Sequence, residues 1–255
     1  MALTMNTTSK CQRFYRLCSH NFGYRMKGTS SRKWLQRQQS DMYVKMARTE
    51  NWRCRSAFKL LEIDDKYKIL KPGQLVIDIG AAPGSWSQVV CQRTNAAGLD
   101  INSPKGKVIS IDLLPISKIP GACIIDCTDF TSQDCQDKII QNSDGRKADV
   151  ILSDMAPNAS GMKEFDGRLL VSLVSKVLQF SVNHLVTNGT VLVKLWQGSG
   201  CDDLSDVMEE LFSSVKIVKP RASRVDSREI YFLCQKFKGA VQQSENTLTN
   251  PETQV

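Results

Sequence analysis

The chain has 255 residues, of which 41% are hydrophobic and 24% charged, and its formal net charge at pH 7 is +8. This length suits one α/β domain with terminal tails, and the apolar fraction excludes a generally disordered chain. Because no run approaches 18 uncharged apolar residues, the sequence predicts no membrane-spanning segment. The sequence is silent on the oligomeric state, and a monomer is the default expectation.

The positive charge is confined to the N-terminal end. Residues 1–40 contain eight basic residues and no acidic residue, whereas the rest of the chain has 26 of each sign. The same segment is rich in Ser and Thr, a composition typical of a mitochondrial transit peptide. A basic arm that binds RNA directly is the alternative. We therefore expect a leader over residues 1–40 and a location in the mitochondrial matrix.

Nine cysteines are spread along the chain, and none forms a CxxC pair. The two histidines stand far from any pair of cysteines, so the sequence predicts no zinc or other metal site. Most of the cysteines lie in apolar surroundings, which indicates reduced core thiols in an intracellular compartment.

Helices and strands alternate along the first half of the chain. Residues 52–70 form an amphipathic pattern that predicts a helix stopped by Pro72 and Gly73. A buried strand is expected to end near residue 79, and a turn then leads into a second helix. Residues 95–106 predict a polar surface loop. Further elements are expected as strands at 108–112 and 121–126 and a helix at 131–142.

The second half continues this pattern with a strand at 148–154, a helix at 166–186, a helix-ending turn at Asn188-Gly189 and a strand at 190–196. An amphipathic helix at 201–212 precedes two strands at 214–220 and 229–237. About nine polar residues join these last two strands, too few for a crossover helix, so they should form an antiparallel hairpin. Residues 239–255 are polar and predict a disordered tail.

Seven strands alternating with helices predict one Rossmann-like α/β domain over residues 41–238. We expect a mostly parallel, doubly wound sheet with helices on both faces and an antiparallel hairpin at its end. That terminal hairpin is typical of class I methyltransferases rather than of dehydrogenases.

The first strand leads into the turn 80–86 with the sequence GAAPGSW. Glycine here lets a ligand approach the backbone, and the following helix offers free N–H groups. The third glycine of GxGxxG is missing and a proline stands inside the loop. This disfavours pyrophosphate and favours a zwitterionic ligand such as the methionine part of S-adenosylmethionine; an ordinary tight turn is the alternative.

Charged residues stand at the ends of the other strands. Asp112 follows the second strand, where an acidic residue binds ribose hydroxyls in such folds, and Asp129 could accept from an adenine amino group. A helix cap or a turn is the alternative for both. Asp154 ends the fourth strand beside the expected crevice. Lys194 breaks the apolar run of the fifth strand, so it either reaches the crevice or is buried at a cost.

Six segments carry a resemblance to a known family: RCRSAFKLLEI, DIGAAPGSWSQ, IDLLP, LSDMAPNASG, VKLWQGSG and KPRASRVDSREIYF. In this order and spacing they resemble the FtsJ (RrmJ) family of ribosomal-RNA uridine-2′-O-methyltransferases from about residue 40 to 238. With its basic leader, the chain looks like a mitochondrial member of that family. The resemblance implies methyl transfer from S-adenosylmethionine to a ribose 2′-hydroxyl of large-subunit ribosomal RNA, free or in a pre-ribosomal particle.

The resemblance also implies site residues. A catalytic tetrad falls on Lys59, Asp154, Lys194 and Glu229. Taken alone, Lys59 is equally well explained as a surface charge, and Glu229 would be a surface charge by default. The cofactor positions are Pro83, Gly84, Ser85, Trp86, Asp112, Asp129 and Asp154. The family often has glycine where Ser85 stands, and serine keeps the backbone donor. The loop 95–106 is longer than in bacterial relatives and has no assigned role.

Lys194 is the candidate proton acceptor. An amine can act as a base only when deprotonated, which needs burial or a neighbouring cation such as Lys59 to lower its pKa. Asp154 opposes that lowering, because a carboxylate favours the ammonium form. The alternative is that Lys194 stays charged and steers the hydroxyl lone pair.

Two clusters of basic residues predict RNA binding beside the tetrad. They are Lys45, Arg48, Arg53 and Arg55 in the first, and Lys216, Lys219, Arg221, Arg224 and Arg228 in the second. Solvated surface charge is the alternative.

Three other functions fit the sequence less well. A cap-type messenger-RNA 2′-O-methyltransferase shares the tetrad and fold, but the chain has no evident cap-binding domain. A non-catalytic RNA-binding assembly factor would not need all four tetrad residues. A nicotinamide dehydrogenase is disfavoured by the proline-containing turn and by the terminal hairpin.

Overall fold

The computed structural model describes residues 37, 39–157, 160–198 and 201–239. The predicted leader, apart from residues 37, 39 and 40, and the predicted tail beyond residue 239 lie outside this part of the chain. Within the described ranges, no helix has the length and apolarity that crossing a membrane requires.

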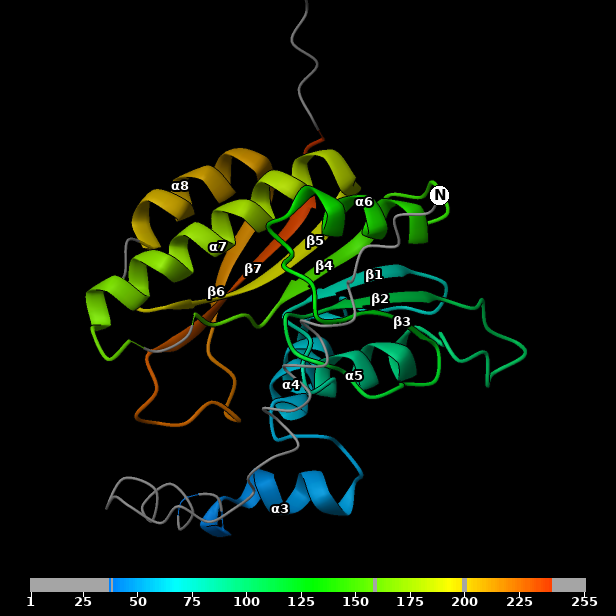
Figure 1. Ribbon diagram of the computed structural model, residues 1–255, viewed down its shortest axis with the longest axis horizontal. Coiled ribbons are helices and arrows are strands. Elements are labelled where there is room, and N and C mark those ends of the chain that lie inside the picture. The colour runs from blue at the N-terminus through cyan, green and yellow to red at the C-terminus, as the bar shows by residue number, and fades with distance from the viewer. Residues whose placement is uncertain (1–36, 38, 158–159, 199–200, 240–255) are drawn as a thin grey trace, which may run out of the picture.

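The core of the fold is a seven-stranded sheet with the order β3-β2-β1-β4-β5-β7-β6 (Figure 1). Its strands are β1 Leu75–Ile79, β2 Lys107–Ile111, β3 Ala122–Ile125, β4 Ala148–Ser153, β5 Leu185–Trp196, β6 Phe212–Val218 and β7 Glu229–Phe237. The first five strands pair in parallel, and β7 runs antiparallel to both β5 and β6. The predicted parallel sheet with an antiparallel terminal hairpin is confirmed.

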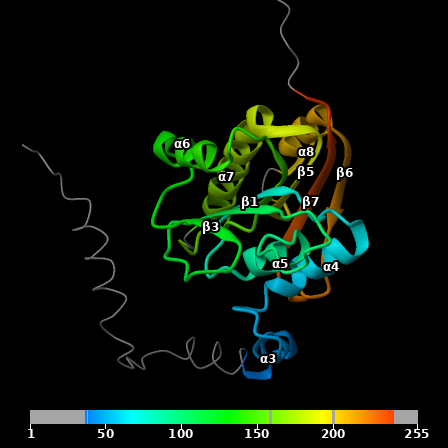
Figure 2. The ribbon, with the colours of Figure 1, turned by 90° about the vertical axis from the view of Figure 1, so that its right-hand side faces the viewer.

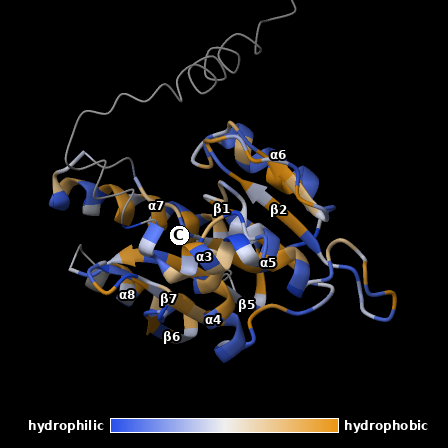
Figure 3. Cartoon of the chain, turned by 90° about the horizontal axis from the view of Figure 1, so that it is seen from below, coloured by the Kyte–Doolittle hydropathy of each residue, from blue (hydrophilic) through white to orange (hydrophobic). Residues whose placement is uncertain are grey.

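Helices cover both faces of this sheet (Figures 1 and 2). Helices α4 (Ala57–Tyr67) and α5 (Ser85–Arg93) cover one face, and α6 (Gln133–Asn142), α7 (Lys163–His184) and α8 (Cys201–Leu211) cover the other. A hydrophobic core fills the space on each side, with apolar strands lying between helices that turn polar residues outward (Figure 3). The short helix α3 (Met42–Thr49) stands apart and packs Ala47 near Phe58 and Ala222.

Helix boundaries differ from the predicted ones where backbone groups have other partners. The helix expected over 52–70 begins at Ala57, because the N–H groups of Trp52 and Arg53 donate to the Ala47 carbonyl and the Gln88 side chain. It ends at Tyr67, and Lys68 follows in the left-handed conformation. Helix α7 begins three residues earlier than the predicted 166.

The predicted turn at Asn188-Gly189 is wrong. Both residues lie within β5, and the pairing with β4 shifts register between Ala148 and Val150. Asn188 has a φ of 66°, and a side chain on Gly189 would lie 2.6 Å from Cγ of Leu185. The two residues therefore form an irregularity inside the strand, because residues with access to left-handed backbone serve bulges as well as turns.

Candidate active site

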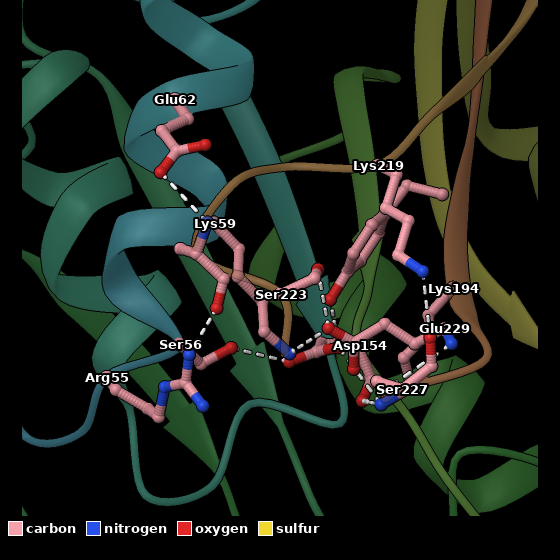
Figure 4. Close-up of polar contacts among 12 residues, drawn as sticks. Arg55, Ser56, Lys59, Glu62, Asp154, Lys194, Lys219, Ser223, Ser227 and Glu229 are labelled. Atoms are coloured by element: carbon pink, nitrogen blue, oxygen red, sulfur yellow. Dashed lines mark hydrogen bonds and ion pairs between the residues drawn. The ribbon is translucent and has the colours of Figure 1, made fainter. Parts of the chain in front are cut away.

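Four charged side chains meet at the carboxyl edge of the parallel strands (Figure 4). Lys59 comes from α4, Asp154 follows β4 directly, Lys194 lies in β5 and Glu229 begins β7. They form two ion pairs: Lys194 Nζ lies 3.0 Å from Asp154 Oδ1, and Lys59 Nζ lies 2.7 Å from Glu229 Oε1. The structure thus brings all four residues of the predicted tetrad together.

Asp154 is the most heavily bonded member of this group. Its carboxylate accepts from Ser56 Oγ at 2.7 Å and from Tyr231 Oη at 2.9 Å, in addition to Lys194. Burial acts to raise its pKa, but the charges of Lys194 and Lys59 and the hydrogen bond from Ser56 outweigh burial and hold the pKa below its ordinary value. Asp154 is therefore an anion at neutral pH.

Lys194 is held in one orientation by the sheet. Its side chain is 9% exposed, and its ammonium group donates both to the carboxylate and to the backbone carbonyl of Asp154. Tyr231 is its cross-strand partner on β7, which places the phenol and the ammonium side by side on one carboxylate. An ammonium group has three donors, so one N–H remains for a substrate oxygen.

The Lys59–Glu229 pair opens toward the surface. Ser223 Oγ donates to Glu229 Oε1 at 2.8 Å, and Lys59 Nζ lies 5.9 Å from the ring centre of Tyr231. A hollow of about 240 Å³ adjoins this pair and is lined by Cys54, Arg55, Ser56, Lys59, Arg224, Ser227 and Glu229. A polar ligand group entering this hollow would meet the tetrad directly.

The predicted cofactor turn has the shape of a ligand-binding loop. Gly80 and Gly84 have φ values of 80° and 106°, and a cis peptide joins Ala82 to Pro83. A side-chain carbon on Gly80 would lie 2.3 Å from Cγ of Met155, the residue after Asp154. The two strand ends therefore pack together only because residue 80 is glycine.

Ser85 and Trp86 begin α5 with their side chains turned inward. Ser85 is buried, and its hydroxyl accepts from the Cys54 thiol at 3.0 Å. The Trp86 indole packs near Tyr231 and donates to the Ser56 carbonyl at 2.9 Å. At these two positions, the groups left for a ligand are the backbone N–H groups of the first helical turn.

Acidic residues follow one another along the cofactor side of the sheet. Asp112 accepts from the backbone N–H groups of Ala82 and Leu114, which fixes the loop 80–84 against β2. Asp129 is exposed and accepts from Thr131, the turn geometry given as its alternative. Ligand binding by these two residues stays a prediction.

Asp78 belongs to this acidic row although the sequence analysis did not select it. It is fully buried in β1; one carboxylate oxygen accepts from Ser87 Oγ at 2.7 Å, and the other has no partner among the described residues. Burial raises its pKa to about 7. A charged residue inside the apolar strand LVIDI was the signal in the sequence.

Ser56, Ser223 and Tyr231 were also missed. Each donates to a tetrad carboxylate, two to Asp154 and one to Glu229. Nothing in their local sequence distinguishes them from ordinary polar residues. The partner of Ser56 and Tyr231 lies far away along the chain, and Ser223 reaches Glu229 across a loop.

The predicted RNA-binding residues separate into two groups. Four arginines already bind protein groups: Arg53 binds the Pro83 and Lys118 carbonyls, Arg55 binds Asp41 and the Ala222 carbonyl, Arg224 binds Asp41, and Arg228 binds the Gln197 carbonyl. These arginines connect separate loops through hydrogen bonds and ion pairs, and Arg53 supports the turn 80–86 through the Pro83 carbonyl. Four further residues are exposed, namely Lys45, Arg48, Lys219 and Arg221, although Lys219 Nζ also donates to the Ser227 carbonyl at 2.9 Å. RNA binding stays a prediction for all eight. Lys216 lies away from the tetrad, in a separate groove.

The sheet order, the reversed strand β7 and the glycine turn at the end of β1 together define a Rossmann-like methyltransferase fold. Comparison with known families agrees: residues 52–237 match the FtsJ-like methyltransferase family. The chain belongs to that family.

Individual relatives align over most of the chain. It is 47% identical over 211 residues to "rRNA methyltransferase 2, mitochondrial" of Drosophila melanogaster, covering 83% of this chain and 84% of the relative. It is 43% identical over 230 residues to "Ribosomal RNA large subunit methyltransferase E" of Parvibaculum lavamentivorans, covering 89% of each. A crystal structure described as a Plasmodium falciparum ribosomal RNA methyltransferase superposes with a TM-score of 0.65 at 32% identity, covering 74% of this chain and all of that one.

Among the described residues, no three His, Cys, Asp or Glu side chains gather in a group that could hold a metal ion.

Proposed function

We propose that the protein transfers a methyl group from S-adenosylmethionine to a ribose 2′-hydroxyl, on a uridine, of mitochondrial large-subunit ribosomal RNA. The observation that carries this proposal is the position of the Asp154–Lys194 pair, directly beside the turn that follows β1. A group held by that turn and a hydroxyl beside Lys194 would meet over the same carboxyl edge of the sheet.

The chemistry of the crevice fits S-adenosylmethionine. Asp78, Asp112 and Asp129 offer acceptors along three neighbouring strands, and one buried oxygen of Asp78 has no partner within the described ranges. Such a row repels phosphates and suits a ligand that carries an ammonium group, a positive sulfur and ribose hydroxyls. When bound, this cofactor supplies a methyl group that is already activated by the sulfonium.

The residues of the chain then have to hold the acceptor hydroxyl in line with the methyl carbon and sulfur, which is the main catalytic requirement for an activated donor. We assign this role to Lys194, because its ion pair with Asp154 and its bond to the Asp154 carbonyl fix its position. Its free N–H binds the 2′-oxygen and orients a lone pair. The oxygen–carbon bond forms as the carbon–sulfur bond breaks, and the hydroxyl proton passes to water.

The Lys59–Glu229 pair would hold the target ribose from the side of the hollow. Glu229 accepts from a sugar hydroxyl while Lys59 and Ser223 fix its carboxylate. Lys59 also places a second positive charge near Asp154.

The substrate and the compartment rest on two supports. The relatives described above are named as ribosomal RNA methyltransferases, one of them mitochondrial. The basic, acid-free composition of residues 1–40 suits import into mitochondria.

The test is methyl transfer from labelled S-adenosylmethionine to mitochondrial large-subunit ribosomal RNA and its particles, followed by nucleoside digestion. We expect the label in 2′-O-methyluridine. The pH dependence then separates the two roles of Lys194. A single-turnover rate that does not change between about pH 6 and about pH 9 supports steering, whereas a log-linear rise of that rate with pH supports a base. Label on a base, or no label on any RNA form despite cofactor binding, would contradict the proposal.

A further inference from the structure

A second polar groove lies at the opposite edge of the sheet from the tetrad. It has a volume of about 500 Å³ and is formed by the start of β5, the end of β7, β6 and the segment after α4. Four lysines line it, Lys68, Lys71, Lys216 and Lys236, against one acidic residue, Asp149.

The charges of this groove are not balanced within the protein. Asp149 is occupied, since its carboxylate accepts from the Leu75 N–H at 2.7 Å and lies 3.5 Å from Arg146. In the part of the chain that the structure describes, none of the four lysines forms an ion pair with a carboxylate. The tetrad, by contrast, pairs each of its lysines. The groove therefore presents an uncompensated positive field.

Two of these lysines occupy backbone positions that disfavour a side chain. Lys68 and Lys236 have φ values of 52° and 61°, in the left-handed region where glycine or asparagine is usual. Lys68 caps the end of α4, where glycine is the common residue. A lysine at both positions costs some stability and adds positive charge to the same groove.

Basic side chains continue along the surface from the groove toward the tetrad. The ring of Tyr67 has Lys66 at 5.1 Å and Lys216 at 5.5 Å from its centre. It also lines the next hollow along, together with Lys219 and Arg221. The acids of that hollow are turned to internal partners: Glu62 accepts from the Arg221 and Ala222 N–H groups, and Asp65 pairs with Arg93.

The distance between the groove and the tetrad decides what kind of ligand could contact both. Strand β7 runs from Glu229 in the tetrad to Lys236 in the groove, a distance of about 23 Å at about 3.3 Å per residue. A single nucleotide cannot reach both sites, whereas the phosphates of an extended RNA can.

We propose that this groove binds the sugar–phosphate backbone of the RNA substrate at a distance from the methylated nucleotide. The inference rests on the proposed function for the identity of the RNA. Phosphate contacts of this kind carry no sequence information and position the substrate, so the groove would increase affinity for long RNA without changing the chemical step.

The test variant is Lys71→Glu/Lys216→Glu, which reverses two exposed charges in the groove. The matched control is Arg168→Glu/Lys176→Glu, which makes the same change in net charge on the exposed face of α7. Binding of a ribosomal RNA fragment is measured by fluorescence anisotropy over a range of KCl concentrations. Methyl transfer is measured on that fragment and on a short oligonucleotide holding only the target nucleotide and its neighbours.

We expect the groove variant to bind the long fragment roughly 10-fold more weakly. The slope of log affinity against log salt concentration should become shallower by the equivalent of about two phosphate contacts. Its KM for the long fragment should rise while kcat, and all parameters on the short oligonucleotide, stay as in the control. Equal binding by the groove variant and the control would overturn the inference even if the wild type methylates RNA. Weaker binding by the groove variant, with no 2′-O-methylation by the wild type, would support the groove and reject the proposed function. No RNA binding by the wild type would overturn both.

Discussion

Two carboxylates at the ends of neighbouring strands, one fully buried and one mostly buried, differ in their pKa. Asp78 in β1 and Asp154 after β4 belong to the same edge of the same sheet. Burial raises the pKa of Asp78 to about 7, and only the hydrogen bond from Ser87 opposes it. Burial also acts to raise the pKa of Asp154, yet Lys194 and Lys59 with their positive charges bring it below the ordinary value.

The difference shows that the partners of a carboxylate, and not its burial, decide its charge here. Asp154 has two hydroxyl donors and a lysine within 3.0 Å, so it stays anionic and fixes Lys194. Asp78 keeps one buried oxygen that has no partner among the described residues, so burial dominates its pKa. The end of β4 therefore holds a lysine in a fixed ion pair, whereas the end of β1 keeps a carboxylate that has one hydrogen-bond partner among the described residues.

The largest effect is expected from Lys194→Ala, which removes the nearest cation of Asp154. If Lys194 orients the substrate oxygen, methyl transfer should fall by roughly 100- to 10,000-fold. The single-turnover rate with labelled cofactor measures this change. Lys176→Ala on the exposed face of α7 is the control and should keep full activity.

The same variant should raise the pKa of Asp154, since its largest favourable charge is gone. Loss of one partner of a buried pair also destabilises the fold, by about 3–5 kcal/mol in typical cases. A variant that methylates RNA at the wild-type rate would remove Lys194 from the mechanism, whatever its stability.

A change in the pH dependence of stability is expected from Asp78→Asn. The folded-state pKa of about 7 lies above the ordinary 3.8, so the unfolded chain loses this proton first. The protonated carboxyl contributes up to about 4 kcal/mol to the free energy of unfolding. This contribution is fully present below about pH 4 and is lost as the pH rises to about 7. Asparagine cannot titrate, so the variant should gain stability relative to the wild type over that interval.

Urea unfolding of both proteins from about pH 4 to about pH 8 tests this prediction. Ser87→Ala sharpens this prediction, because the Ser87 hydroxyl lowers the pKa of Asp78. Without that hydroxyl, the pH at which the stability loss is complete should be higher. A constant difference between wild type and Asp78→Asn across the range would show that Asp78 does not titrate there.

The sequence predicted the strands and the tetrad for different reasons. Short apolar runs such as VISID and ADVILS bury both faces in a parallel sheet, so strand positions followed from hydrophobicity. Asp154 and Lys194 followed from their places at a strand end and inside an apolar strand. The family resemblance added Glu229 and decided for Lys59, whose local signal was weak.

Side-chain partners could not be predicted in the same way. Arg53 and Arg55 belong to a basic segment that suggested RNA contacts, yet their guanidinium groups bind carbonyls and a carboxylate from other segments. Asn188-Gly189 has the composition of a turn. It is part of a strand only because Leu185 before it and Thr190 after it both pair with β4. Both outcomes depend on contacts between residues distant in sequence.

A smaller effect is expected from Gly80→Ala. Gly80 lies where the end of β1 packs against the end of β4. The added carbon would lie 2.3 Å from Cγ and 3.0 Å from Cα of Met155, at a φ of 80°. We expect a loss of about 1–3 kcal/mol in stability together with weaker cofactor binding, because both the turn and Met155 must shift. Thermal unfolding with and without S-adenosylmethionine measures the two effects. Gly145→Ala is the control, since its φ of 71° is similar and no atom lies within 4 Å of the added carbon.

The smallest effect is expected from Ser56→Ala, which deletes one hydroxyl donor of Asp154. The Trp86 indole bonds to the backbone carbonyl of Ser56, so the substitution leaves that contact in place. A hydrogen bond to a charged group contributes about 1.5–3 kcal/mol. Because the other donors remain, we expect about a 10-fold loss in kcat.

Ser56 acts on the reaction through Asp154, and its effect should therefore depend on pH. Loss of a donor to the charged form raises the pKa of Asp154, so the acid limb of the pH–rate profile should move to higher pH. Ser223→Ala removes the matching donor of Glu229 and should leave that limb in place, while Ser56→Thr should restore it. If both alanine variants lower kcat equally with no shift in the acid limb, the two halves of the tetrad act as one unit and the special position of Asp154 is lost.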